Sequence, residues 1–393
     1  MIYERPYDRW LLLSTLALLG FGALMIYSST SVITPAMEAR NVTEFHYFRR
    51  HLSAMAMGLA GMYAAYRVRP DLLSRWSIPL LGLALVLLLL VFVPGIGVKA
   101  GGARRWIRLW PTTFQPSELV KLAMVVFLAR YMSRPGYRPD RFSHFLLPLG
   151  VAGAIQLVFL EQPDFGATVS LAVLTLAMLF LSGVRLRYVA FLVLMASPVL
   201  LKLAMEPYRL KRLTSFLNPW KHAQDSGFQL VQSFIALGSG GAWGLGLGRS
   251  RQKLEFLPEV HTDFIFSMVG EELGFVVAAS LVALFCFIFL RGLRIAMAAT
   301  DRFTYYLASG LSLMIALQSL VNFGVVTGML PTKGLPLPFI SYGGSSLLIN
   351  MLAVGLLLNL SRQGTPAPPP TVDDLGVLIE RKKVRRSIYG GVR

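Results

Sequence analysis

Long apolar stretches separated by short, arginine-rich segments run along most of the 393-residue chain. Crossing about 30 Å of hydrocarbon takes a helix of roughly 20 mostly apolar residues. The stretches that approach this length cover residues 10–30, 50–66, 76–95, 116–133, 144–160, 165–183, 187–206, 263–290, 303–328 and 341–361. The pattern predicts an all-α polytopic membrane protein with about ten transmembrane helices. A large extracytoplasmic loop, residues 207–262, then lies between helices 7 and 8.

The composition agrees with a membrane setting. Hydrophobic residues make up 55% of the chain and charged residues only 15%, whereas a soluble domain is more polar. The single cysteine, Cys286, lies inside an apolar run, which excludes a disulfide scaffold and a cysteine-based metal site. The net charge of +18 is explained by arginines beside apolar runs and by anionic lipid, and we expect no nucleic-acid partner.

The arginine positions predict the orientation. Alternate short loops carry clusters of arginine, namely Arg67, Arg69 and Arg75; Arg130, Arg134, Arg138 and Arg141; Arg185 and Arg187; and Arg291, Arg294 and Arg302. The positive-inside rule places these loops and both termini in the cytoplasm. The first apolar run lacks a signal-peptide cleavage site and is long enough to span, so we expect a retained anchor. Residues 1–363 form the membrane domain, and the proline-rich, basic residues 364–393 form a flexible cytoplasmic tail.

Two outer segments break this charge rule. The short one contains Arg104 and Arg105, and the long one, residues 207–262, contains Arg212 and Lys253. The long segment is also rich in aromatic residues, so we expect an ordered surface. Within it, one apolar face is formed by Phe228, Val231, Phe234 and Ile235. That spacing fits a short helix lying in the membrane interface or, equally, ordinary packing onto the bundle.

Asp263 stands where the long outer segment enters an apolar run, next to His261. An acid at a membrane boundary is costly and points to a function. At this depth Asp263 can act as a general base toward a sugar hydroxyl, or it can help cap the following helix. Glu271 is eight positions further on, about 80° round the helix, and can share the Asp263 cavity. Glu272 faces the other way and needs a partner helix.

Two further groups of charges lie near outer helix ends. Glu118 and Lys121, spaced i, i+3, can meet on one helix face, either as a stabilising ion pair or as the lining of a polar cavity. Glu161 and Asp164 share a very short outer turn. The two acids can hold a divalent cation, although building the turn is the preferred interpretation.

The segment before the last span holds Lys333, the hydroxyl of Ser341 and two glycines. Free backbone N–H groups at the start of the following helix, together with Lys333, can bind an anionic phosphate. Small residues there also allow close helix packing. No nucleotide motif such as a P-loop is present, so energy must come from an activated substrate.

Several motifs occur in the order typical of one family. They are Trp110-Pro-Thr-Thr-Phe-Gln-Pro-Ser-Glu-Leu-Val-Lys121, Gln252-Lys-Leu-Glu-Phe-Leu-Pro-Glu-Val-His-Thr-Asp-Phe-Ile-Phe266 and Pro338-Phe-Ile-Ser-Tyr-Gly-Gly-Ser345. Over residues 8–362 the chain resembles the SEDS proteins of bacterial shape, elongation, division and sporulation. The Gln-Lys-Leu lead-in makes it most similar to the FtsW branch, with a RodA-type elongation role as the alternative.

The resemblance implies a peptidoglycan glycosyltransferase that polymerises lipid II at the outer face of the bacterial cytoplasmic (inner) membrane, at the division septum. It implies that Asp263 removes the proton from the acceptor 4-hydroxyl, which displaces undecaprenyl pyrophosphate with inversion. Glu118 and Lys121 match positions that line the central cavity. We expect pyrophosphate neutralisation from Lys333 and from some of Arg104, Arg105, Arg212 and Lys253.

The resemblance also implies partners and alternatives. The partners are an FtsI-type class B penicillin-binding protein, which cross-links the strands, and other divisome proteins. A divalent cation, Mg²⁺ or Mn²⁺, is the only cofactor considered, and no nucleotide or organic cofactor is expected. The two rival functions are a lipid II flippase, which should need midplane charge and paired broken helices, and a non-catalytic divisome scaffold.

Overall fold

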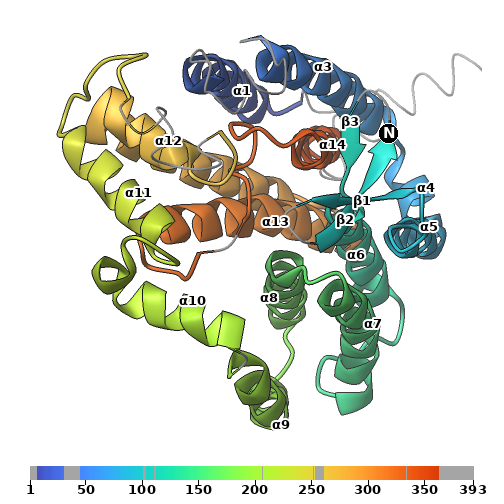
Figure 1. Ribbon diagram of the computed structural model, residues 1–393. Helices are drawn as coiled ribbons and strands as arrows, with labels where there is room; N and C mark the ends of the chain where they lie inside the picture. Colours follow the sequence, from blue (N-terminus) through green and yellow to red (C-terminus); the bar gives the residue numbers. More distant parts are fainter. Residues whose placement is uncertain are drawn as a thin grey trace, which may run out of the picture.

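The computed structural model describes residues 7–30, 45–100, 103–109, 112–205, 207–250, 252, 261–332 and 334–362. Within them the chain is almost entirely helical (Figure 1). The first half contains α1 (Arg9–Thr30), α3 (His46–Arg67), α4 (Pro70–Arg75), α5 (Ser77–Leu90), α6 (Pro116–Ser133), α7 (Phe142–Glu161) and α8 (Phe165–Leu181). The second half contains α9 (Leu186–Ala204), α10 (Pro207–Leu217), η1 (Pro219–His222), α11 (Phe228–Ser239), α12 (Ile265–Met297), α13 (Arg302–Val326) and α14 (Gly344–Leu360).

The ten predicted apolar stretches correspond, within a few residues at most ends, to ten of these helices. Four of them, α1, α7, α12 and α13, are long and apolar enough to cross a membrane by themselves. Apolar helices of 10–17 residues occur at α5, α8, α11, α14 and in the first part of α9. The largest difference is α12, which continues to Met297 rather than ending near residue 290.

The bundle is organised around α6 and α13. Most side chains of both helices are buried, and α13 packs against α6, α8 and α12 (Figure 1). Helices α3 and α14 lie side by side, and small residues let them approach closely: a Cβ on Gly355 would lie 2.2 Å from the Met62 carbonyl oxygen. Lipid gives no hydrophobic drive for helices to associate, so such close packing must contribute much of the stability.

A small antiparallel sheet departs from the all-helical expectation. Strands β1 (Gly97–Ala100), β2 (Ala103–Leu109) and β3 (Thr112–Phe114) form it in the order β1-β2-β3. It occupies the short outer segment that carries Arg104 and Arg105. Sequence reasoning missed it because a three-strand sheet with strands this short gives almost no alternating pattern.

The long segment after α9 is ordered in its described part, as predicted. Helix α11 forms where expected, but it packs against α12 and α13, which is the alternative of ordinary packing onto the bundle. The predicted apolar face is wrong in detail: Val231 is buried, whereas Ile235 is 41% exposed. Leu230, Ser233 and Ala236 complete the packed face instead. The helix therefore turns a mixed face, not its most apolar one, toward the bundle.

Candidate functional site

Asp263 lies in a turn, residues 261–264, directly before α12. The helix begins at Ile265 and its N-cap residue is Phe264, so Asp263 does not begin the helix as the sequence suggested. The Asp263 side chain is half-buried. It lies against the backbone of Gly334, where a Cβ would come within 2.8 Å of Asp263 Oδ2. The carboxylate therefore faces the segment that leads into α14.

The backbone around Asp263 is fixed from two sides. Asn322 of α13 donates from Nδ2 to the Asp263 carbonyl oxygen, at 2.8 Å, and also to the carbonyl oxygen of Leu335, at 2.8 Å. On the other side, the N–H of Tyr342 donates to the carbonyl oxygen of His261, at 2.8 Å. These bonds hold the turn against the 334–343 segment. They orient the backbone at Asp263.

An aromatic cluster surrounds the His261 ring. The rings of Tyr47 and Tyr342 have centroids 5.0 and 5.6 Å from the His261 ring, and 5.4 Å from each other. Tyr47 belongs to α3, so three segments distant in sequence meet two residues from Asp263. The sequence analysis included His261 but missed Tyr47, whose position at a helix start gave no signal.

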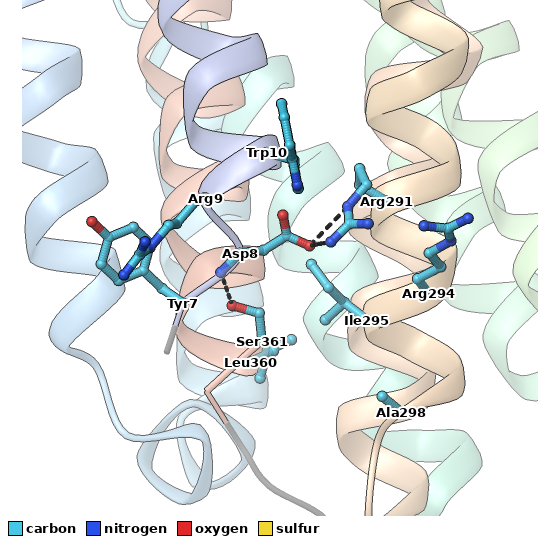
Figure 2. Close-up of a pocket in the computed structure, with 10 residues that line it drawn as sticks. All are labelled: Tyr7, Asp8, Arg9, Trp10, Arg291, Arg294, Ile295, Ala298, Leu360 and Ser361. Carbon is cyan, nitrogen blue, oxygen red and sulfur yellow. Dashed lines mark hydrogen bonds and ion pairs between the residues drawn. The ribbon is translucent and has the colours of Figure 1, made fainter. Parts of the chain in front are cut away.

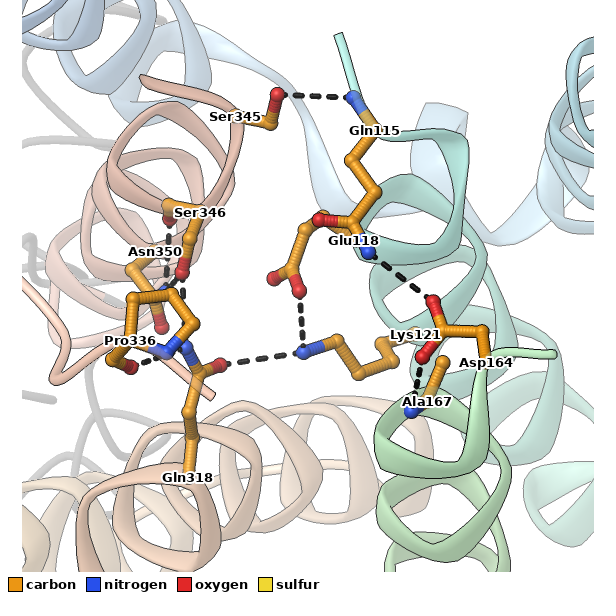
Figure 3. A network of polar contacts seen from close by, with 10 residues as sticks. All are labelled: Gln115, Glu118, Lys121, Asp164, Ala167, Gln318, Pro336, Ser345, Ser346 and Asn350. Carbon is orange, nitrogen blue, oxygen red and sulfur yellow. Dashed lines mark hydrogen bonds and ion pairs between the residues drawn. The ribbon is translucent and has the colours of Figure 1, made fainter. Parts of the chain in front are cut away.

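Glu118 and Lys121 form the buried ion pair that their spacing predicted. Lys121 Nζ lies 2.9 Å from Glu118 Oε1 and 3.2 Å from Gln318 Oε1 of α13 (Figure 3). Gln318 Nε2 in turn donates to Ser346 Oγ, at 2.8 Å, and to the Pro336 carbonyl oxygen, at 2.9 Å. The pair is thereby connected to α14.

One oxygen of this network has spare hydrogen-bonding capacity. Glu118 Oε2 is buried and has no hydrogen-bond partner within the described part of the chain. A buried carboxylate oxygen without a donor is costly, so an ion pair serving stability alone would not be expected to leave it unmet. This oxygen can accept a hydrogen bond from a ligand or from water.

Helix α13 links this ion pair to Asp263. Gln318, which contacts Lys121, and Asn322, which contacts Asp263, are four residues apart and share one face of the helix. The rise between them is ~6 Å. Sequence reasoning singled out neither amide, although two amides at i, i+4 within an apolar helix were the available signal.

Glu271 and Glu272 are buried and accept hydrogen bonds from neighbouring segments. Glu271 accepts from Ser250 Oγ at 2.5 Å, and Glu272 accepts from Ser28 Oγ of α1 at 2.6 Å and from the Ser250 N–H at 3.3 Å. The predicted partner helix for Glu272 is therefore α1. Glu271 is directed at the outer segment.

A break in α12 follows these glutamates, and the sequence analysis missed it. Gly274 has φ 79° and ψ −179°, so the helix is interrupted there. Residues 241–246 enter the break: the N–H groups of Leu245 and Gly246 donate to the carbonyls of Glu271 and Glu272. The exchange is reciprocal, since Phe275 N–H donates to the Gly241 carbonyl. The outer segment is thus attached to α12 through the backbone.

The contacts of Asp164 build the short turn between α7 and α8, which agrees with the preferred interpretation. Asp164 accepts from the Ala167 N–H, at 3.1 Å, which caps α8, and from Gln115 Nε2, at 3.1 Å (Figure 3). Arg105 Nη2 donates to the Pro163 carbonyl oxygen, at 2.5 Å, and its Nε to that of Gln162, at 3.4 Å. Across the described ranges, no group of three or more histidine, cysteine, aspartate and glutamate side chains could hold a metal ion.

The remaining predicted residues are spread over the molecule. Ser341 Oγ accepts from the Leu337 N–H at 2.8 Å, which fixes the turn before α14. Arg104 on β2 and Arg212 on α10 have exposed side chains. Lys253 and Lys333 lie outside the described residues. The structure therefore brings together Asp263, His261 and Ser341 in neighbouring turns, with Glu118 and Lys121 one helical turn of α13 away.

Comparison with known proteins identifies the family. The sequence profile of the family described as "Cell cycle protein", which covers FtsW, RodA and SpoVE, matches residues 9–365. The chain belongs to the FtsW/RodA/SpoVE family. This confirms the resemblance seen in the motifs, and the family's membrane fold agrees with the helical bundle described above.

Members of the FtsW/RodA/SpoVE family match nearly the whole chain. A probable peptidoglycan glycosyltransferase FtsW from Trichlorobacter lovleyi is 45% identical over 358 residues, 90% of this chain and 93% of that protein. Another, from Coxiella burnetii, is 44% identical over 90% of this chain and 96% of its own length. Stage V sporulation protein E of Bacillus subtilis is 40% identical over 90% of this chain and 97% of its own length.

Solved structures of the FtsW/RodA/SpoVE family share the fold. A chain from a peptidoglycan synthase complex, described for its coordination of polymerization and crosslinking, has 28% identity and a TM-score of 0.75, over 91% of this chain and 98% of that chain. The rod shape determining protein RodA of Thermus thermophilus has 27% identity and a TM-score of 0.65, over 92% of this chain and 98% of that chain.

Proposed function

We propose that this protein is a peptidoglycan glycosyltransferase of cell division that polymerises lipid II at the outer face of the cytoplasmic membrane. The observation that carries the proposal is the setting of Asp263, which is half-buried in the turn directly before α12. Asn322 holds its backbone carbonyl, and the Tyr342 N–H holds the carbonyl of His261 in the same turn. Relatives named FtsW, 45% identical over 90% of this chain, support the assignment.

In the proposed reaction Asp263 acts as a general base. Its carboxylate takes the proton of the acceptor sugar 4-hydroxyl, and the hydroxyl oxygen forms a bond to the anomeric carbon of the donor. The bond from that carbon to the pyrophosphate oxygen breaks, and undecaprenyl pyrophosphate leaves with the electron pair, so the anomeric centre is inverted. The rigid turn favours this step because a base held in place needs little reorganisation.

The polar network around Glu118 and Lys121 is proposed to line the substrate cavity, with Gln318 as an additional member. Its support is the buried oxygen of Glu118 that lacks a donor. Pyrophosphate neutralisation is assigned to Lys333, Arg104, Arg212 or Lys253. Arg105 is the weakest candidate, because its guanidinium already contacts two carbonyl oxygens. The described residues do not gather a ligand set for Mg²⁺ or Mn²⁺, so no step is assigned to a cation.

The proposal includes a partner and an orientation. A structural relative belongs to a synthase complex that coordinates polymerization and crosslinking, which supports an FtsI-type class B penicillin-binding protein as partner. Both termini face the cytoplasm and the Asp263 turn faces outward, at the division septum. The arginine-rich loops at one end of the helices support this orientation.

The deciding experiment is glycan-chain formation from labelled lipid II. The purified protein is reconstituted with its cross-linking partner, with a β-lactam present to block cross-linking. We expect polymer from the parent and at least a 100-fold loss in Asp263→Asn, on the order of the loss seen when an essential acid–base group is removed. The matched control is Asp225→Asn, an equal loss of charge at an exposed acid on the long outer segment. Polymer from Asp263→Asn at the parent rate would overturn the base assignment.

Lipid II translocation is the second candidate, favoured by one observation. Helix α12 is interrupted at Gly274, and interrupted helices are typical of transporters. The test is movement of labelled lipid II across proteoliposome membranes. If both the parent and Asp263→Asn move lipid II and neither makes polymer, the transport function replaces the polymerase. If the protein shows neither activity but still binds its partner, the non-catalytic scaffold function is supported.

A further inference from the structure

A pocket of about 370 Å³ lies at the opposite end of the bundle from Asp263, between α1, α12 and α14 (Figure 2). The start of α1 and the last turns of α12 and α14 form its walls. Its lining includes Tyr7, Asp8, Arg9, Trp10, Arg291 and Arg294. None of these residues belongs to the site described above, and the proposed glycosyl transfer does not use them.

The floor of the pocket is an ion pair between Asp8 and Arg291, in which both carboxylate oxygens of Asp8 already accept hydrogen bonds. Asp8 Oδ2 accepts from Arg291 Nε, at 3.0 Å, and from Arg291 Nη2, at 2.5 Å (Figure 2). The other oxygen, Asp8 Oδ1, accepts from the Leu11 N–H at 2.9 Å. The Asp8 N–H donates to Ser361 Oγ at 3.0 Å, which joins α1 to the end of α14. Among the described residues that line the pocket, Asp8 is the one acid, and it is therefore already neutralised.

The rim of the pocket has an excess of positive charge and exposed aromatic rings. Arg9 and Arg294 are exposed, and the described part of the lining contains three arginines and one acid, Asp8. Trp10 is 62% exposed and Tyr7 40% exposed. Tryptophan and tyrosine favour the headgroup level of a bilayer, and guanidinium groups favour phosphate oxygens.

We infer that this pocket binds the phosphate of an anionic phospholipid from the adjacent leaflet. Arg294 contacts the phosphate oxygens, the Asp8–Arg291 pair forms a rigid floor, and Trp10 packs beside the upper acyl chain. Arg9 lies beside Tyr7 on the other side of this pair (Figure 2) and attracts the anionic headgroup through its charge. A lipid is favoured over a soluble phosphate compound because the pocket lies near the ends of α1 and α12, two helices long and apolar enough to span a membrane. The end of a membrane-spanning helix is expected at the headgroup level. The inference is independent of the assignment of Asp263.

The test measures the thermal unfolding of the full chain in detergent with added phosphatidylglycerol, phosphatidylcholine or inorganic phosphate. We expect phosphatidylglycerol to raise the midpoint and the other two to leave it nearly unchanged. Arg9→Gln/Arg294→Gln should lower the apparent affinity for phosphatidylglycerol, by on the order of fivefold for each arginine. The matched control, Arg130→Gln/Arg302→Gln, removes two exposed arginines outside the pocket lining and should respond like the parent.

The outcomes separate the sources of the phosphate. Equal stabilisation by inorganic phosphate would replace the lipid with a soluble phosphate compound. An equal loss in the control variant, or no response of the parent, would overturn the site, because general attraction to the membrane would then explain the arginines. If the double variant unfolds, Arg294→Gln is compared with Arg294→Lys, and retention of the response by lysine alone supports a charge contact.

Discussion

Asn322 on α13 donates from Nδ2 to the backbone carbonyl oxygen of Asp263, 2.8 Å away, and thereby attaches the turn before α12 to the core of the bundle. The same amide group also donates to the Leu335 carbonyl oxygen. One buried side chain thus fixes two segments whose relative position sets where the Asp263 carboxylate lies. Asn322 is a positioning residue in this arrangement, since it contacts the backbone and not the reacting atoms.

We expect Asn322→Ala to lower the rate of polymerisation strongly in protein that is still folded. The buried carbonyl oxygen of Leu335 would lose its donor, at about 1–3 kcal/mol, and the part-buried carbonyl oxygen of Asp263 would lose its donor as well, so the turn would no longer be fixed. Polymer formation from labelled lipid II and thermal unfolding are measured side by side. The positioning role is supported if kcat falls at least tenfold with KM nearly unchanged.

Ser319→Ala is the control for Asn322→Ala. Ser319 is buried one turn earlier on α13, but its hydroxyl bonds only to carbonyls of its own helix. Its removal should leave kcat within about twofold, because the cost of losing such a bond is small. Equal losses of kcat in the two variants would contradict the positioning role, because any substitution in this part of α13 would then have the same effect.

Breaking the Glu118–Lys121 pair should be strongly destabilising. Lys121→Met leaves a buried carboxylate without its cation, at about 3–5 kcal/mol. Glu118→Gln/Lys121→Met should regain most of the thermal stability, because neither partner is then charged. We expect polymerisation to stay low in the double variant, as the proposed cavity needs both charges. Full recovery of polymer would show that the pair serves only the fold.

Gly274→Ala should disrupt the attachment of the outer segment to α12. The positive φ is unfavourable for alanine, and its Cβ would lie 2.4 Å from the Gly244 nitrogen. A loss of about 3 kcal/mol or more is expected in the free energy of unfolding. Gly150→Ala is the control, since that glycine is helical with open space around its Cβ position, and it should gain ~0.5–1 kcal/mol. If Gly274→Ala unfolded at the same temperature as the parent, the interruption of α12 at this residue would be contradicted.

Substitution of the two adjacent arginines on β2 should affect thermal unfolding differently, because Arg105 makes hydrogen bonds and Arg104 is exposed. Arg105→Gln loses both bonds to the 162–163 turn and should cost roughly 1 kcal/mol in thermal unfolding. Arg104→Gln should stay within about 0.5 kcal/mol, because that side chain is exposed. If Arg104 neutralises the leaving group, its substitution lowers kcat without lowering stability. The reverse stability order would contradict the contacts assigned to Arg105.

Local sequence pattern predicted the helices well and their interruptions poorly. The apolar runs predicted ten helices, and the i, i+3 spacing predicted the contact of Glu118 with Lys121, since both depend on neighbours within one turn. The break at Gly274 was missed because isolated glycines are common in membrane helices. Its φ is set by residues 241–246, which enter from the outer segment.

The candidate site was predicted in part. Asp263, His261 and Glu118 stood out because ionisable groups at membrane depth are costly. Asn322 and Tyr47 did not, because their importance comes from contacts across the fold: Asn322 meets Asp263 from 59 residues further along the chain. A neutral amide or a tyrosine in a membrane helix is not costly enough to attract attention by itself.

The sequence by itself determined that this is a helical membrane protein of the FtsW/RodA/SpoVE family with an acid where an apolar run begins. The number of apolar residues per span and the order of short motifs suffice for that. Only the tertiary structure decided what fixes Asp263, which face of α11 packs and which arginines are already engaged. These depend on hydrogen bonds and packing between helices, and lipid supplies no hydrophobic pattern from which such contacts can be read.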